Sequence, residues 1–224
     1  MAQRSNRFLT ALTAATAVAL MAATAAMAAT VIGDASSNVL TGTDERDVIL
    51  GRGGDDTVNA LARGDLVRGG RGADTVNAGH GRDRVHGGRD NDVLNGEEGH
   101  DFISGGRGDD TLSGGPRGDI IFANRGRDHT DGGDGRDRLW ALSRFDVTVI
   151  GDPEGDELSG GNGRDLFRVR DGEVDLVHCG EGNDRVLADQ FDVVDTDCEH
   201  VHRREVTSLD QVDDGAENRV EDAS

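Results

Sequence analysis

The sequence predicts an all-β fold, a parallel β-solenoid in which two nine-residue repeats make one coil. An aspartate or asparagine recurs at every ninth residue from Asn38 to Asp146, with glycines before it and, in most units, an apolar residue two places after it. Thirteen such units fill residues 33–149. The chain has 34 glycines and only 34% hydrophobic residues, too few for a thick globular core, and a disordered chain has no reason to keep such a period.

Each unit reads glycine, glycine, any residue, glycine, any residue, aspartate, any residue, apolar, any residue. Glycine permits positive φ, so the first six positions predict a turn. The apolar eighth residue between two outward-facing neighbours predicts a strand of about three residues. A strand this short cannot bury its apolar side chain alone, so we expect successive units to stack and share a thin core.

Two units per coil place turns at both edges of a flattened tube. Units i and i+2 then lie one above the other, separated by about 4.8 Å. One edge is expected to carry Asp56, Asp74, Asp92 and Asp110. The other is expected to carry Asp83, Asp101, Asp119 and Asp137.

The period shifts by one residue at Ile150 and again at Val169, and a bulge or a wider turn can absorb each shift. The four units that follow, over 151–159, 160–168, 170–178 and 179–187, place Asp156, Asp165, Asp175 and Asp184 at the recurring position. Sixteen aspartates then occupy this position, and they account for most of the net charge of −20.

Carboxylates stacked at strand spacing repel one another and need a cation. Calcium suits them because it takes six to eight oxygen ligands in forgiving geometry, whereas magnesium requires a strict octahedron and zinc prefers His or Cys. Two aspartates from stacked turns and nearby main-chain carbonyls would supply such a set. The alternative, that aspartate serves only as a turn residue bonded to nearby N–H groups, explains one or two positions rather than sixteen.

The chain resembles the RTX, or haemolysin-type, calcium-binding repeats over residues 33–187, and this nonapeptide is known to bind calcium in such proteins. The resemblance implies a right-handed parallel β-roll, with one calcium between successive turns on each edge and several ions in all. The implied ligands are turn carbonyls and the aspartates Asp47, Asp56, Asp65, Asp74, Asp83, Asp92, Asp101, Asp110, Asp119, Asp128, Asp137, Asp165 and Asp184. The best-matching turns supply Gly69, Gly70, Gly72, Gly105, Gly106, Gly108, Gly132, Gly133, Gly135, Gly160, Gly161 and Gly163.

Four units depart from the pattern because they lack most of the glycines, and we expect their sites to be distorted or empty. They are 42–50, 60–68, 141–149 and 170–178. Family members exported in one step usually have a C-terminal signal and no cleaved N-terminal one. This chain shows the reverse arrangement, which argues against that export route.

The ends of the chain point to export. Residues 1–28 combine two arginines, an uncharged apolar run and the sequence Ala26-Met27-Ala28, which predicts a cleaved secretory signal rather than a membrane anchor. The mature chain is then expected outside the cell, with no membrane span. Cys179 and Cys198 are the only cysteines, and nineteen residues is close to one coil, so a disulfide is expected, with free thiols as the alternative. We assign residues 29–203 to the coil and 204–224 to an acidic disordered tail.

The net charge and the absence of catalytic motifs bear on the function. Nucleic-acid binding is not expected, because the charge is strongly negative. No segment remains for a catalytic domain, and no zinc-protease, nucleophile-elbow or phosphate-loop motif occurs, so the sequence predicts a secreted non-enzymatic calcium-binding protein. Two alternatives stay open: an accessory domain of a secreted toxin or hydrolase, and an adhesion or ligand-binding face. The adhesion or ligand-binding face is suggested by the repeated segments Thr57-Val58-Asn59 and Thr75-Val76-Asn77.

Overall fold

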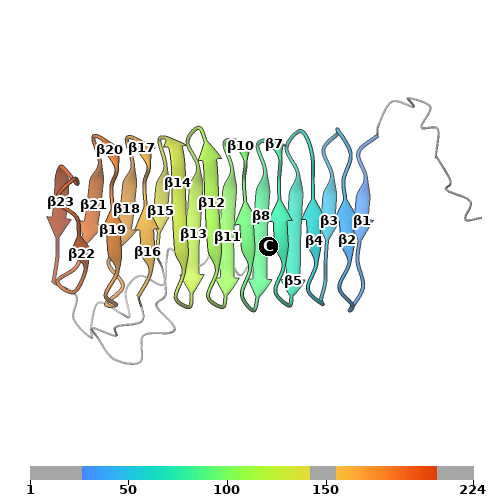
Figure 1. Cartoon of the computed structure of the whole chain (residues 1–224), viewed down its shortest axis with the longest axis horizontal. Coiled ribbons are helices and arrows are strands. Elements are labelled where there is room, and N and C mark those ends of the chain that lie inside the picture. The colour runs from blue at the N-terminus through green and yellow to red at the C-terminus, as the bar shows by residue number, and fades with distance from the viewer. Residues whose placement is uncertain (1–26, 142–154, 206–224) are drawn as a thin grey trace, which may run out of the picture.

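The computed structural model describes residues 27–141 and 155–205, which form one elongated parallel β-solenoid (Figure 1). The solenoid has about nine turns of about eighteen residues, or two nonapeptides per turn. Both the fold class and the number of repeats per coil predicted from the sequence are confirmed. Within the described ranges, no helix is long and apolar enough to cross a bilayer.

Alternate units contribute to two sheets that face each other across the tube. The first sheet has ten strands in the order β1 (Thr30–Ile32), β3 (Val48–Leu50), β5 (Leu66–Arg71), β8 (Arg84–Arg89), β11 (Phe102–Arg107), β13 (Ile120–Arg125), β15 (Arg138–Trp140), β18 (Leu166–Val169), β21 (Arg185–Ala188) and β23 (His200–Arg203). The main path of the second sheet runs through β2 (Val39–Thr41), β4 (Thr57–Asn59), β6 (Thr75–Asn77), β9 (Val93–Asn95), β12 (Thr111–Pro116), β14 (His129–Gly135), β16 (Glu157–Ser159), β19 (Leu176–His178) and β22 (Val193–Val194).

Four two-residue strands pair in the turns themselves. They are β7 (His80–Gly81) with β10 (Glu98–Gly99), and β17 (Asn162–Gly163) with β14 and β20 (Glu181–Gly182). The turns are therefore hydrogen-bonded from coil to coil, as the strands are.

The core is thin, because each unit buries mainly its eighth residue, joined in some units by a small side chain at the first position such as Ala60 or Ala78. Register pairs Val67 with Val85, Val85 with Ile103, and Ile103 with Ile121, each eighteen residues apart. All four side chains are buried. The residues on either side of them are exposed or half-buried, as the sequence predicts, except Ser104, which is buried.

The stack divides into two clusters of buried side chains. The first contains Leu40, Ile49, Val58, Ala60, Val67, Val76, Ala78, Val85, Leu94, Ile103, Leu112 and Ile121. The second contains Leu139, Ala141, Leu158, Phe167, Val169, Val177, Cys179, Val186 and Ala188. Phe167, in the second cluster, is the largest fully buried side chain among the described residues.

The first predicted register shift, of one residue at Ile150, does not describe how the strands on either side of it pair. β14 pairs directly with β16, Thr130 opposite Leu158, so the unit 141–149 adds no strand between them. Residues 142–154, with Asp146 and Ile150, lie outside the described residues. β15 is in the first sheet and β16 in the second, and Asp128 contacts Asp156 directly, so no rung lies between these two aspartates.

The second predicted shift is confirmed. The turn that follows β18 carries one extra residue, and the contacts between successive coils span nineteen residues there instead of eighteen. The wider turn lets the flanking strands keep their register, with Leu158 opposite Val177.

The predicted disulfide is present. Cys179 and Cys198 are bonded, with their Cα atoms 5.2 Å apart. Cys179 lies in the turn after β19 and Cys198 lies just before β23, so the bond joins the last strand to the coil beneath it.

Candidate metal centre

The recurring aspartates line both edges of the solenoid in two columns, which we call the ladders. The first ladder starts at Asn38 and continues through Asp56, Asp74, Asp92, Asp110, Asp128, Asp156, Asp175 and Asp192. The second ladder runs through Asp47, Asp65, Asp83, Asp101, Asp119, Asp137, Asp165 and Asp184 to Glu199. The assignment of aspartates to two edges matches the prediction, and the structure adds Asp192 and Glu199 at the end.

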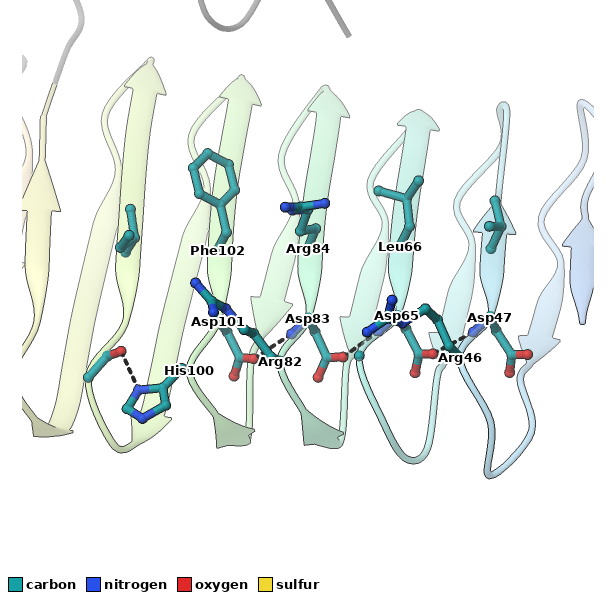
Figure 2. Close-up of a pocket in the computed structure, with 14 residues that line it drawn as sticks. Arg46, Asp47, Asp65, Leu66, Arg82, Asp83, Arg84, His100, Asp101 and Phe102 are labelled. Atoms are coloured by element: carbon teal, nitrogen blue, oxygen red, sulfur yellow. Dashed lines mark hydrogen bonds between the residues drawn. The ribbon is translucent and has the colours of Figure 1, made fainter. Parts of the chain in front are cut away.

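One carboxylate oxygen of each ladder aspartate binds the main chain of the preceding coil. The N–H of Asp74 donates to Oδ1 of Asp92 at 2.8 Å, and the N–H of Asp83 donates to Oδ1 of Asp101 at 2.8 Å. Figure 2 shows several such contacts in succession along the second ladder. Because the side chain points back along the edge, the ladder aspartates are almost fully buried.

The other oxygen, Oδ2, is buried without a hydrogen bond in most rungs. This state is unusual, since buried polar atoms are nearly always partnered. It holds for Asp56, Asp65, Asp74, Asp83, Asp92, Asp101, Asp110, Asp119, Asp137, Asp156, Asp165, Asp175 and Asp184. The repetition at one atom type indicates a ligand position rather than a local packing fault.

Burial shifts the acidity of these groups. It raises the pKa of Asp92 and Asp119 to about 8, and that of Asp110 to about 7, with repulsion by neighbouring carboxylates adding to the effect. Hydrogen bonds from the main chain act in the opposite direction without cancelling it. Near neutral pH the metal-free ladder must therefore take up protons or bind cations to relieve this cost.

The first glycine of each turn leaves room beside the orphaned oxygen. A Cβ placed on Gly132 would lie 2.8 Å from both Oδ2 of Asp137 and the carbonyl oxygen of Gly160, and one on Gly114 would meet an equivalent pair. Two oxygens from successive coils thus face the same small space. Carboxylate and carbonyl oxygens are the donors that calcium uses, so the residues present fit this ion.

The second and fourth turn positions need positive φ. All eight glycines predicted at these positions in the best-matching turns have it: Gly70, Gly72, Gly106, Gly108, Gly133, Gly135, Gly161 and Gly163. The first-position glycines Gly69, Gly105, Gly132 and Gly160 do not, and they serve instead to leave space for Oδ2.

The unit 60–68 keeps the turn geometry despite its poor match, which corrects the expectation of distortion. Leu61 and Arg63 adopt φ of 84° and 70° at the two glycine positions. Asp65 is buried, and its Oδ1 accepts the N–H of Asp47 as in the regular rungs. Neighbouring coils impose the turn on these side chains at a conformational cost.

The unit 42–50 differs from the others at its carboxylate. Oδ2 of Asp47 accepts the main-chain N–H of Thr43, and the hydroxyl of Thr43 also lies within hydrogen-bond distance of it, 3.1 Å. In this rung, Oδ2 of the aspartate therefore already has hydrogen-bond donors from the protein.

A groove of about 620 Å³ runs outside the second ladder (Figure 2). The turns supply one wall and outward-facing residues of the first sheet supply the other. Its principal residues are Arg46, Arg82 and His100 on the turn side, and Leu66, Phe102 and Ile120 on the sheet side. The sequence did not predict this groove, because it arises from the fifth and seventh positions of alternate units, which vary freely in the repeat.

The outer faces of the two sheets differ in chemistry. On the second sheet, Thr57 stacks on Thr75 and Asn59 on Asn77, and the amide of Asn77 donates to Asn59 at 3.1 Å. The predicted polar ladder on that face is confirmed as geometry. On the first sheet, the ring of Phe122 stacks on Trp140 with centroids 4.6 Å apart.

Comparison with known proteins agrees with this geometry. No curated protein matches the chain. The family model for the RTX calcium-binding nonapeptide repeat matches residues 32–62, 60–94, 86–116 and 113–143, which together cover half of the sequence. The chain therefore belongs to the family of RTX calcium-binding nonapeptide repeat proteins.

Proposed function

We propose that this chain is an exported, non-enzymatic calcium-binding protein whose coil forms when calcium occupies the ladders. The observation that carries the proposal is the column of buried Oδ2 atoms without hydrogen-bond partners on each edge. Each one faces a main-chain carbonyl oxygen of the next coil in the turns where the first residue is glycine, as at Gly114 and Gly132. Family membership supports the choice of calcium.

Calcium would supply what the protein lacks at these rungs. A cation beside Oδ2 neutralises the carboxylate, which otherwise loses its hydration on burial and repels the rungs above and below. The thin core adds little stability per coil, since each unit buries one main apolar side chain. Binding free energy would then become folding free energy, and the metal-free chain is expected to be unfolded at neutral pH.

A calcium titration of the mature chain, followed by far-ultraviolet circular dichroism, tests this proposal. We expect coil in excess chelator, strand in calcium, and no comparable transition with magnesium at the same concentration. A chain that keeps its full strand signal in chelator at pH 8 would show that calcium does not organise the fold.

A matched pair of variants locates the ions. Asp110→Asn removes the charge of one ladder rung and leaves an oxygen to accept the N–H of Asp92. Asp109→Asn removes the same charge from the adjacent exposed residue. We expect the first to require more calcium for folding and the second to behave as the wild type. Equal shifts in both variants would indicate general charge screening rather than ligation.

Export is part of the proposal and rests on the predicted signal in residues 1–28, most of which lie outside the described residues. The disulfide supports it, because such bonds persist in oxidising compartments. N-terminal sequencing of the protein recovered from the culture medium would test it, with a start near residue 29 expected. Recovery of the full-length chain from the cytoplasm alone would contradict it.

A second candidate function is a ligand-binding face, and the groove outside the second ladder favours it. The groove joins arginines to apolar side chains, and four ladder aspartates also line it: Asp47, Asp65, Asp83 and Asp101. With calcium on the ladder, the arginines would remain as charges for an anionic partner with an apolar part. If this function holds, Arg82→Gln would weaken partner binding and leave the calcium titration unchanged. An arginine variant that altered calcium binding instead would point back to the first function.

A further inference from the structure

The turn between β18 and β19 departs most from the repeat, and it gathers three acids. Asp171, Glu173 and Asp175 each offer a carboxylate oxygen, and these oxygens lie within 4.8 Å of one another. Two oxygens that share an ion at about 2.4 Å can be no farther apart than about 4.8 Å. The three groups therefore meet the distance condition for a common cation.

All three acids are buried. Asp175 is 0% exposed, Glu173 is 4% exposed and Asp171 is 9% exposed. Oδ1 of Asp175 accepts the N–H of Asp156 at 2.8 Å, as in any ladder rung, while its Oδ2 has no hydrogen-bond partner. Asp175, which carries a fully buried oxygen without a hydrogen bond, thus has two further carboxylates beside it.

Hydrogen bonds to carboxylates fix the turn that carries the three acids. Within the turn, the N–H of Glu173 donates to Oδ1 of Asp171 at 3.1 Å. Asp189 accepts the N–H of Gly172 at 2.9 Å and the N–H of Phe191 at 2.8 Å, one on each oxygen. The side chain of Asp189 thereby fixes Gly172, the residue between Asp171 and Glu173.

We propose that Asp171, Glu173 and Asp175 form a calcium site of different composition at one rung of the first ladder. Three carboxylates of a single turn supply it, where a regular turn supplies one carboxylate and glycines. The loss of the glycine pattern in this unit marks a change of ligands, and the prediction from sequence of a distorted or empty site took only the glycines into account.

The higher density of negative charge sets this site apart in affinity. The strength of calcium binding rises with the number of charged ligands and the rigidity of the site. We expect this site to fill before the other ladder sites during a calcium titration. The inference does not depend on the other rungs binding calcium.

The test compares two double variants that remove the same charge. Asp171→Asn with Glu173→Gln alters the cluster, and Glu97→Gln with Glu98→Gln alters an exposed turn of the second ladder. Bound calcium is counted by equilibrium dialysis, and affinity is measured by competition with a chelator of known strength. We expect the first variant to lose one ion of the tightest class and the second to match the wild type.

Stability in calcium supplies a second readout. The cluster variant should unfold at a lower urea concentration than the wild type, because it has lost a bound ion. The control variant should match the wild type. If the cluster variant fails to fold, Glu173→Asp keeps the charge and shortens the side chain, and it should weaken the tightest site by at least about tenfold.

Each result separates this inference from the proposed function. An unchanged number of ions and unchanged affinity in the cluster variant, with calcium-dependent folding retained, would overturn only the three-carboxylate site. A wild type that binds a single calcium, lost in the cluster variant, would uphold this site and overturn the other ladder sites. A wild type that binds no calcium would overturn both.

Discussion

The coils over residues 51–141 and those over 156–203 form the same ladders with different spacing. In the regular region, the N–H of each ladder aspartate up to Asp119 reaches a carboxylate eighteen residues later, as from Asp92 to Asp110. Asp128 and Asp137 join the two regions, with contacts that span 28 residues. In the irregular region the same contact spans 19 residues from Asp165, 17 from Asp175 and 15 from Asp184. What the two regions share is the hydrogen bond between coils, while the number of residues in the turn varies.

The comparison shows which constraints the coil imposes on its sequence. The regular region repeats one coil length over an aliphatic core of Val, Ile, Leu and Ala. The irregular region uses a phenylalanine core, a disulfide and clustered carboxylates. These particular features end the stack in a defined way, and disturbing them should have local effects.

The largest expected effect of a single substitution is in the irregular core. Phe167→Ala should lower the free energy of unfolding in calcium by about 3–5 kcal/mol, because it removes the largest fully buried side chain and leaves a cavity. Leu112→Ala, in the regular core, should lower the free energy of unfolding by roughly 2–5 kcal/mol, and by less than Phe167→Ala does. Urea unfolding measures both. A smaller loss for Phe167→Ala would mean that the irregular coils repack freely.

Removal of the disulfide should give the next largest loss of stability. Cys179→Ala with Cys198→Ala should cost about 3 kcal/mol, the value expected for a closed loop of this length. Hydrogen exchange should accelerate in β21 and β23 while β5 and β8 stay protected. An equal acceleration in all four strands would show that the disulfide stabilises the whole stack and would remove the contrast between the regions.

A glycine pair tests the regular turns. Gly70→Ala should lower stability by about 1–3 kcal/mol, because Gly70 has φ of 123° and a Cβ there would meet the carbonyl oxygen of Arg52 at 2.5 Å. Gly53→Ala is the control, since Gly53 is not among the positive-φ residues and its nearest neighbour would lie at 3.5 Å. Thermal unfolding in calcium compares them. Similar melting temperatures would show that the turns tolerate strain, as the turn at Leu61 does.

The smallest expected effect concerns pH in the absence of calcium. The pKa of Asp92 is raised to about 8 in the coil, against 3.8 ordinarily, so its charge opposes folding increasingly as pH rises from about 4 to about 8. The chelated wild type should therefore gain strand signal on acidification. Asp92→Asn should hold that signal to a higher pH, measured by circular dichroism. Identical profiles would mean that this rung has little influence on the metal-free coil.

The sequence predicted those parts of the fold that depend on period, namely the solenoid, the two edges and the inward eighth residue. It also predicted the Cys179–Cys198 bond from a separation close to one coil. The prediction of a rung at Asp146 between Asp128 and the next aspartate was wrong, because Asp128 contacts Asp156 directly. Pairing of β14 with β16 decides the point, and no local pattern reports it.

The stacking of the aspartates at two edges was predicted from their spacing, but the separate roles of their two carboxylate oxygens were not. Residue spacing cannot tell that Oδ1 accepts the N–H of the preceding coil while Oδ2 stays without a partner, because both depend on the stacked neighbour. Asp192 could have been found, since Asp192-Val193-Val194 repeats the aspartate and apolar pattern, but its shortened turn hides it from a search at fixed period. The acids at Asp171 and Glu173 were noted only as missing glycines.

The N–H of each rung donates to the carboxylate of the next coil. This makes a change of length by eighteen residues easy to accommodate and a change by nine difficult. Deletion of eighteen residues, such as 69–86, rejoins like positions, and every remaining rung still finds a carboxylate after it. Deletion of nine would move all later strands to the opposite sheet, so that the aromatic face and the polar face exchange along the rest of the coil. Gene duplication can therefore lengthen this chain by whole coils without any new contact to be selected, whereas an odd repeat would splice two unlike surfaces together.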